Sequence, residues 1–104
     1  MTARFLPEAD AEFEAAADEY DAQSPGTGRR FVLTVREAVA RLIEQPRLYG
    51  AVDPPVHGRD VREAPVSPFD YRLVYEVRAD EILILAVAHN RRLPSYWRGR
   101  LRGT

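Results

Sequence analysis

The sequence lacks cysteine and lysine altogether, and it has only two histidines among its 104 residues. Without cysteine the chain can form no disulfide and has no thiolate to serve as a nucleophile or as a metal ligand. The two histidines, His57 and His89, are too few for a zinc site unless carboxylates supply most of the ligands. We therefore expect no metal, no cofactor and no metal-dependent chemistry.

Long apolar runs are also absent. The longest one, over residues 82–88, has the length of a strand and is far too short to cross a bilayer. The amino terminus turns acidic at Glu8 and has no signal-peptide core. These features predict a cytoplasmic protein without a membrane partner. A length of 104 residues, 45% of them hydrophobic and 30% charged, predicts a single domain over residues 1–104.

Charge is nearly balanced overall but unevenly distributed along the chain. The formal net charge is -1, yet residues 8–21 contain seven acids and no base, whereas residues 88–104 contain five arginines and no acid. This separation predicts an acidic or nucleic-acid partner for the basic end. The overall balance nevertheless argues against a protein that lives on nucleic acid, because such domains are usually strongly basic.

Apolar residues at helical spacing predict two helices in the first half of the chain. A short strand over residues 2–6 precedes a first helix that opens at Pro7, a favourable residue at a helix start. Serine, proline and glycine in residues 24–28 end this helix. A second apolar stripe runs over residues 31–43 and stops before Pro46. Neither helix can bury its stripe alone, so the pair is expected to pack on a sheet.

Three further strands are predicted after a loop rich in proline and glycine. They cover residues 61–66, 71–78 and 82–89, and the last two form the clearest hairpin. Pro65 places the first of these strands at an edge, because proline cannot donate to a central ladder. The order is β-α-α-β-β-β. We predict an α+β fold in which a helical hairpin packs on one face of a mostly antiparallel sheet.

The predicted hairpin runs directly into a cluster of basic and aromatic residues. His89, Arg91 and Arg92 follow the last strand, and Arg62 and Arg72 lie on the two strands before it. We expect these guanidinium groups to converge on one exposed surface. Such a surface suits a phosphate-bearing or acidic partner, because paired guanidinium groups bind these anions well from a rigid base.

A series of short motifs follows one another along the chain: Pro7-Glu8-Ala9, residues 24–31, Gln45-Pro46, Val61-Arg62-Glu63, residues 69–75, residues 89–92 and residues 94–97. In this order and spacing they resemble the RelE/ParE toxins of bacterial type II toxin–antitoxin systems. The resemblance covers residues 4–98, which is nearly the whole chain.

The resemblance implies a small toxin that a cognate antitoxin neutralises, in a possible hetero-oligomer of the two proteins. A flexible antitoxin segment would fold onto the toxin, with apolar anchors on the helices and acids over Arg72, Arg91 and Arg92. An exposed apolar groove beside the first helix is expected in the free protein, with Phe13 and Tyr20 as candidates for its lining.

The family contains two activities on one fold, so the fold does not fix the target. ParE-like members, associated with plasmid stabilisation, act on DNA gyrase, whereas RelE-like members cut mRNA on the ribosome without a metal. A RelE-like reading assigns phosphate binding to Arg72 and Arg92, and acid–base roles to Tyr96 or His89. The net charge of -1 and the missing lysines weigh against a ribosomal nuclease, so the gyrase reading leads.

Packing supplies an alternative for several of these residues. Arg62 and Arg72 could pair with nearby glutamates across the sheet. Tyr96 and Trp97 could pack the tail against the helices, the alternative being that Trp97 contacts a partner or stacks on a base. The tail arginines, Arg98, Arg100 and Arg102, could simply be solvated. A non-toxic scaffold that keeps only its antitoxin-binding surface is the third functional reading.

Overall fold

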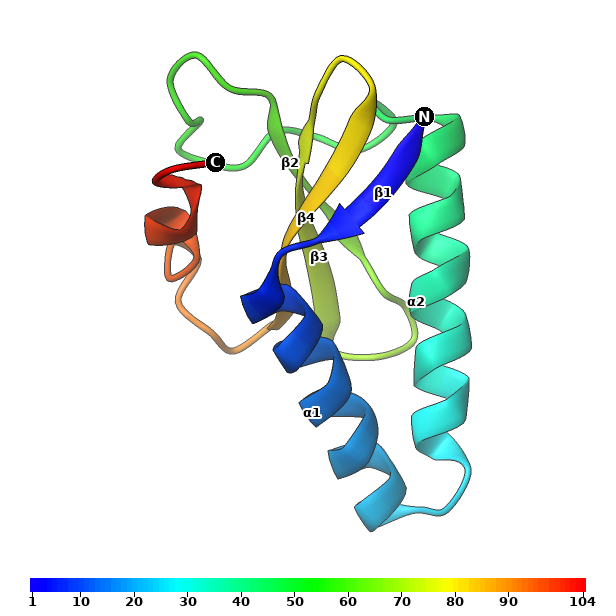
Figure 1. Ribbon diagram of the computed structural model, residues 1–104. Helices are drawn as coiled ribbons and strands as arrows, with labels where there is room; N and C mark the ends of the chain where they lie inside the picture. The colour runs from blue at the N-terminus through cyan, green and yellow to red at the C-terminus, as the bar shows by residue number, and fades with distance from the viewer.

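Two helices and a four-stranded sheet make up the body of the protein, and the computed structural model describes all residues from Met1 to Thr104 (Figure 1). Along the chain the elements are β1 (Thr2–Phe5), α1 (Pro7–Gln23), α2 (Thr27–Glu44), β2 (Val61–Pro65), β3 (Tyr71–Val77), β4 (Glu81–His89) and a 3₁₀ turn (Arg98–Leu101). The predicted order β-α-α-β-β-β is confirmed. The connection between the helices is shorter than predicted, because α2 already begins at Thr27.

The sheet has the strand order β1-β4-β3-β2. β4 pairs in parallel with β1 and antiparallel with β3, and β3 pairs antiparallel with β2. The mostly antiparallel sheet is therefore confirmed, and so is the edge position of β2 that Pro65 predicted. β4 lies in the centre, and residues 82–88 are all buried. Its full apolar run reflects burial on both faces.

A bulge in β4 separates the part that pairs with β1 from the part that does not. Tyr75 pairs with Ile84 and Val74 pairs with Ala86, so Leu85 has no partner in β3. A bulged residue of this kind leaves backbone groups free of the ladder. Because β1 pairs no further along β4 than Ile84, the following edge of β4 needs another partner.

An aromatic cluster joins the helical hairpin to the sheet. Phe31 of α2 is fully buried, and its ring centroid lies 5.3 Å from that of Tyr20 in α1 and 5.1 Å from that of Tyr71 in β3. Phe13 adds a further ring at 5.9 Å from Phe31. Edge-to-face and tilted pairs at these distances add stabilisation beyond the area they bury.

The carboxyl-terminal segment lies on the other side of the sheet from α2 (Figure 1). Trp97 is fully buried there, and Leu101 is 9% exposed. No helix is long and apolar enough to cross a membrane.

The two helices approach most closely at Gly28, where a side chain has no room. A Cβ atom at this position would lie 2.3 Å from the carbonyl oxygen of Ala17 and 2.7 Å from Cγ of Asp21. The Asp21 carboxylate also accepts the Gly28 N–H at 2.7 Å, which satisfies a free donor in the first turn of α2.

We predict that Gly28→Ala lowers the free energy of unfolding by about 1–3 kcal/mol, because the added methyl group forces the helices apart. Urea denaturation followed by circular dichroism measures this loss. Gly99→Ala is the matched control, since a Cβ atom there meets nothing within 4 Å. Equal stability of the Gly28→Ala variant and the wild type would show that the hairpin absorbs the methyl group without cost.

Candidate functional site

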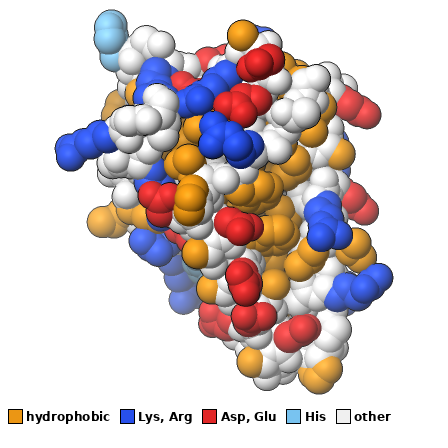
Figure 2. Space-filling view, viewed as in Figure 1, with side chains coloured by type: hydrophobic (Ala, Val, Ile, Leu, Met, Phe, Trp, Pro, Cys, Tyr) orange, Lys and Arg blue, Asp and Glu red, His pale blue; other side chains and the backbone are white.

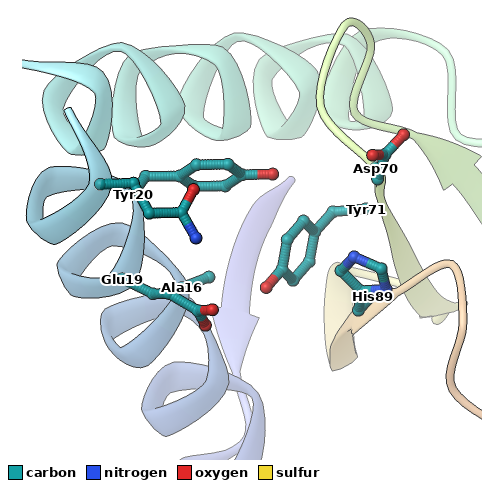
Figure 3. Close-up of a pocket in the computed structure, with 7 residues that line it drawn as sticks. Ala16, Glu19, Tyr20, Asp70, Tyr71 and His89 are labelled. Atoms are coloured by element: carbon teal, nitrogen blue, oxygen red, sulfur yellow. The ribbon is translucent and has the colours of Figure 1, made fainter.

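Two adjoining hollows lie between α1 and the paired ends of β3 and β4. They enclose about 200 and 170 Å³ and share four lining residues: Ala16, Glu19, Tyr71 and His89. Tyr71 and His89 are register partners across the two strands, with ring centroids 5.1 Å apart at an angle of 82°. Figure 3 shows the Tyr71 ring between α1 and His89. The predicted site residue His89 therefore lies at the end of the hairpin, next to α1.

The expected convergence of Arg62 and Arg72 on one exposed surface is wrong. In the β2–β3 ladder Arg62 lies opposite Tyr75, whereas Arg72 lies opposite Pro65, three positions further along β2. Side chains three positions apart point to opposite faces of a sheet. The two guanidinium groups are thus separated by the sheet itself.

Both strand arginines are also engaged inside the protein. Nε of Arg62 lies 2.8 Å from Asp60, and its Nη1 donates to the carbonyl of Tyr49 at 2.7 Å. Nε of Arg72 lies 3.5 Å from Glu63, and its Nη1 donates to the carbonyl of His89 at 3.0 Å. The alternative of pairing with a glutamate across the sheet holds for Arg72, whereas Arg62 pairs with Asp60, two residues before it in the chain. Arg72 fixes the end of β4 rather than presenting a free cation.

Arg91 and Arg92 are the candidate arginines that remain exposed. The Arg92 guanidinium lies 3.9 Å from the ring centroid of Tyr96, within cation–π range. The backbone N–H of Arg91 donates to Nδ1 of His89 at 3.0 Å, so the remaining ring nitrogen carries the proton of neutral His89. Beyond them Leu93 is 75% exposed, the largest exposure of any large apolar side chain. We call residues 90–95 the basic turn.

Glu12 of α1 is the centre of a polar network that sequence reasoning missed. Its two carboxylate oxygens accept hydrogen bonds from the two terminal nitrogens of Arg100, at 2.7 and 2.9 Å. They also accept the Tyr96 hydroxyl at 2.7 Å and the Val87 N–H at 3.1 Å. Arg100 in turn donates to the carbonyl of Leu85 at 2.9 Å. The ion pair therefore caps the edge of β4 that lies beyond the bulge.

Burial and hydrogen bonding shift the pKa values of Glu12 and Tyr96 away from their ordinary values. Burial alone would raise the pKa of Glu12, but the hydrogen bonds from Arg100 and Tyr96 outweigh it and leave that pKa below its ordinary value of 4.5. Burial and the bond to Glu12 raise the pKa of Tyr96 to about 12. The Tyr96 hydroxyl is thus a committed donor at neutral pH.

A second carboxylate, Glu76, joins the tail to the opposite end of β3. Arg59 donates to it at 2.6 and 2.9 Å, and Arg78 donates at 2.8 Å. Arg59 also donates to the carbonyl of Leu101 at 3.0 Å. The hydrogen bond from Arg59 is the main reason why the pKa of Glu76 lies below its ordinary value.

The tail is packed onto the protein, but on the side of the sheet away from α2, and the predicted contact with the helices holds only for Tyr96, which bonds to Glu12 of α1. Trp97 has no exposed surface, so the prediction that it contacts a partner directly is wrong. The description of the tail arginines as solvated is wrong for Arg100 and for Arg98, whose Nη2 donates to the carbonyl of Pro54. Arg102 alone of the three is exposed.

Phe13 and Tyr20 open onto different hollows. Phe13 lies in a shallow groove between α1 and α2, beside Ala17 and Val32. Figure 2 shows this apolar strip between the helices, with acidic side chains along α1. Tyr20 instead lines the larger of the two adjoining hollows, beside Tyr71 (Figure 3). A groove with apolar contacts is present beside α1. Of the two residues predicted to line it, Phe13 does so and Tyr20 does not.

The structure brings three of the four candidate catalytic residues to one hollow: His89, Arg92 and Tyr96. Arg72 reaches it only through its bond to the His89 carbonyl. Helical spacing offered a signal for the missed Glu12, which lies three residues after Ala9 and four before Ala16, at the border of the buried stripe. No local sequence pattern predicts that Arg100 is the partner of Glu12.

Comparison with known proteins gives a family match and several structural matches. The family model described as "ParE toxin of type II toxin-antitoxin system, parDE" matches residues 3–94. A solved structure titled "Chromosomal ParDE TA system from P. aeruginosa" is similar, with a TM-score of 0.71 and 22% identity over 86% of this chain and 95% of that chain. That likeness bears out the predicted fold. No curated protein matches the chain.

We predict that Glu12→Gln lowers the free energy of unfolding at neutral pH by about 1.5–3 kcal/mol, because a charged hydrogen-bond acceptor is lost while the shape is kept. Urea denaturation measures the change. Glu14→Gln is the control, because this exposed glutamate of α1 has no ion-pair partner. A variant as stable as the control would show that Glu12 and Arg100 do not stabilise the fold.

A pH dependence follows from the same carboxylates. The pKa of Glu12 and Glu76 is lowered by folding, so the stability they contribute is present above the pKa of the unfolded chain and is lost as pH falls through the folded pKa. We expect the wild type to lose more stability than Glu12→Gln between about pH 6 and about pH 3. Parallel stability curves for the two proteins would contradict this assignment.

Proposed function

The chain belongs to the ParE toxin family of type II toxin–antitoxin systems, and we propose from this premise that it acts by binding DNA gyrase, without catalysis of its own. It is a toxin component, so a cognate antitoxin is its physiological partner. The family match over residues 3–94 is the observation that carries the proposal. The gyrase target rests on what that family implies together with the state of the candidate catalytic groups.

Those groups favour a binding role. A metal-free nuclease needs a group that can take the 2′-hydroxyl proton and free cations around the phosphate. The Tyr96 hydroxyl is committed to Glu12, and its pKa is about 12. Arg72 is paired with Glu63 and has only 13% of its side chain exposed. Arg92 is exposed, but the other arginine near the Tyr96 ring, Arg100, is paired with Glu12.

The surface that we assign to the target is the basic turn. It presents Arg91, Arg92 and the exposed Leu93 at the end of β4. An apolar side chain next to two cations is suited to a protein partner that offers acids beside an apolar contact. Arg62 and Trp97 are not part of this surface, because both are engaged inside the protein.

The surface that we assign to the antitoxin is the groove between the helices. Phe13, Ala17 and Val32 offer apolar contacts there, flanked by acids of α1 and by Arg36 of α2. An amphipathic helix laid into such a groove would cover the apolar strip seen in Figure 2.

One alternative keeps the catalytic reading. His89, Arg92 and Tyr96 share a hollow, and that arrangement favours a RelE-like ribosome-dependent cleavage of mRNA as the second candidate. A scaffold that binds antitoxin but has lost toxicity is the third.

Expression of the chain alone in bacteria separates these functions. We expect arrested growth, inhibition of DNA supercoiling by purified gyrase, and intact mRNA in primer extension. Cut messages with normal supercoiling would instead establish the nuclease, and Arg72→Ala should then abolish cutting. If expression is harmless and both assays give the result seen without the protein, the protein is a non-toxic scaffold that binds the antitoxin.

The basic turn is tested by charge removal. We predict that Arg91→Ala with Arg92→Ala weakens inhibition of supercoiling by at least about tenfold, because rim cations govern association with an acidic partner. Arg29→Ala with Arg30→Ala is the matched control, since it removes two adjacent exposed arginines from the start of α2. Equal inhibition by both double variants would rule the basic turn out as the target-binding surface.

A further inference from the structure

Three aromatic side chains line the larger of the two adjoining hollows between α1 and the ends of β3 and β4. Tyr20 comes from α1, Tyr71 from β3 and His89 from the end of β4 (Figure 3). The ring centroids of Tyr20 and Tyr71 are 6.0 Å apart, and those of Tyr71 and His89 are 5.1 Å apart. The rings within each pair are steeply inclined, at 62° and 82°. The three rings line a space of about 200 Å³, and aromatic rings can attract a cation that enters it.

The mouth of the same hollow carries carboxylates without partners. Glu19 of α1 and Asp70, which precedes β3, both line it, and neither forms a salt bridge or side-chain hydrogen bond within the chain. The side-chain amide of Gln23 completes the polar rim. No arginine lines this hollow, although the chain has fifteen. A formal charge of about -2 therefore surrounds an aromatic recess when His89 is neutral.

No arginine forms a salt bridge with Glu19 or Asp70. Arg92 lines the adjoining hollow together with Glu19, but its guanidinium stacks on Tyr96. Glu12, also in that adjoining hollow, is paired with Arg100. Burial is the main cause of the raised pKa of Tyr71, and the neighbouring Tyr20, Glu19 and Glu12 raise it further.

We propose that this hollow binds the guanidinium group of an arginine side chain that a partner protein presents. A planar guanidinium can stack on the aromatic faces while it donates paired hydrogen bonds to the rim carboxylates. An ammonium group would use the charge but only part of the planar walls. The space is too small for a folded element and suits a single long side chain. The site is independent of whether gyrase or the ribosome is the target.

The test uses the whole chain and two small probes. N-acetylarginine methylamide is titrated into the ¹⁵N-labelled protein and followed by NMR, with N-acetylcitrulline methylamide as the uncharged probe of nearly the same shape. We expect shifts confined to residues around Tyr20, Tyr71 and His89, with a millimolar dissociation constant. The citrulline probe is expected to bind at least about fivefold more weakly, because it lacks the charge.

Variants of the rim identify the site. Glu19→Gln and Asp70→Asn are each expected to raise the dissociation constant of the arginine probe by about threefold to tenfold, since each removes one charged acceptor. Glu14→Gln is the matched control on α1, because Glu14 lines the groove between the helices instead. The NMR spectra of the variants also report whether each one is folded.

Two outcomes would overturn the proposal. Equal binding of the arginine and citrulline probes would show that charge is not recognised. Shifts that are absent, or that survive unchanged in the folded Glu19→Gln and Asp70→Asn variants, would show that the hollow is not the site. Neither result depends on toxicity, so a failure here is distinct from a failure of the proposed function.

Discussion

The Glu12–Arg100 ion pair covers the part of the β4 edge that β1 does not reach. β1 is too short to cover β4, and the bulge at Leu85 turns backbone groups toward the uncovered edge. Glu12 accepts the Val87 N–H and Arg100 donates to the Leu85 carbonyl, so two side chains stand where a longer strand would have paired. The same pair ties α1, the central strand and the tail into one unit.

The acidic first helix and the basic tail form one salt bridge with each other, between Glu12 and Arg100. The acidic first helix and the basic tail look like separate interaction surfaces, yet Glu12 meets Arg100 across 88 residues of sequence. Arg59 binds both Glu76 and the carbonyl groups of Leu101 and Thr104. Arginine suits these contacts better than lysine, because its planar fork donates to several acceptors at once. Charges without internal partners are therefore the ones available for recognition.

Two such surfaces lie next to each other at the end of the hairpin. The basic turn carries Arg91 and Arg92, whereas the aromatic hollow carries Glu19 and Asp70. His89 belongs to both, since its ring lines the hollow and its Nδ1 accepts the Arg91 N–H. A partner that contacts both surfaces needs acids and an arginine in a fixed arrangement, which favours specificity over simple charge attraction. The end of the hairpin thus presents charges of both signs to a partner, whereas the groove beside Phe13 offers mainly apolar surface.

The order of the elements, the edge position of β2 and the family could all be predicted from the sequence, because helical periodicity, strand runs and Pro65 act through neighbouring residues. The position of His89 at the end of the hairpin could also be predicted, since it directly follows the apolar run of β4. Only the tertiary structure decided which arginines are free. Arg62 and Arg72 fall on opposite faces and find acids, and Arg100 finds a partner far away in sequence. Such pairings depend on register, a bulge and the path of the tail, which no local pattern encodes.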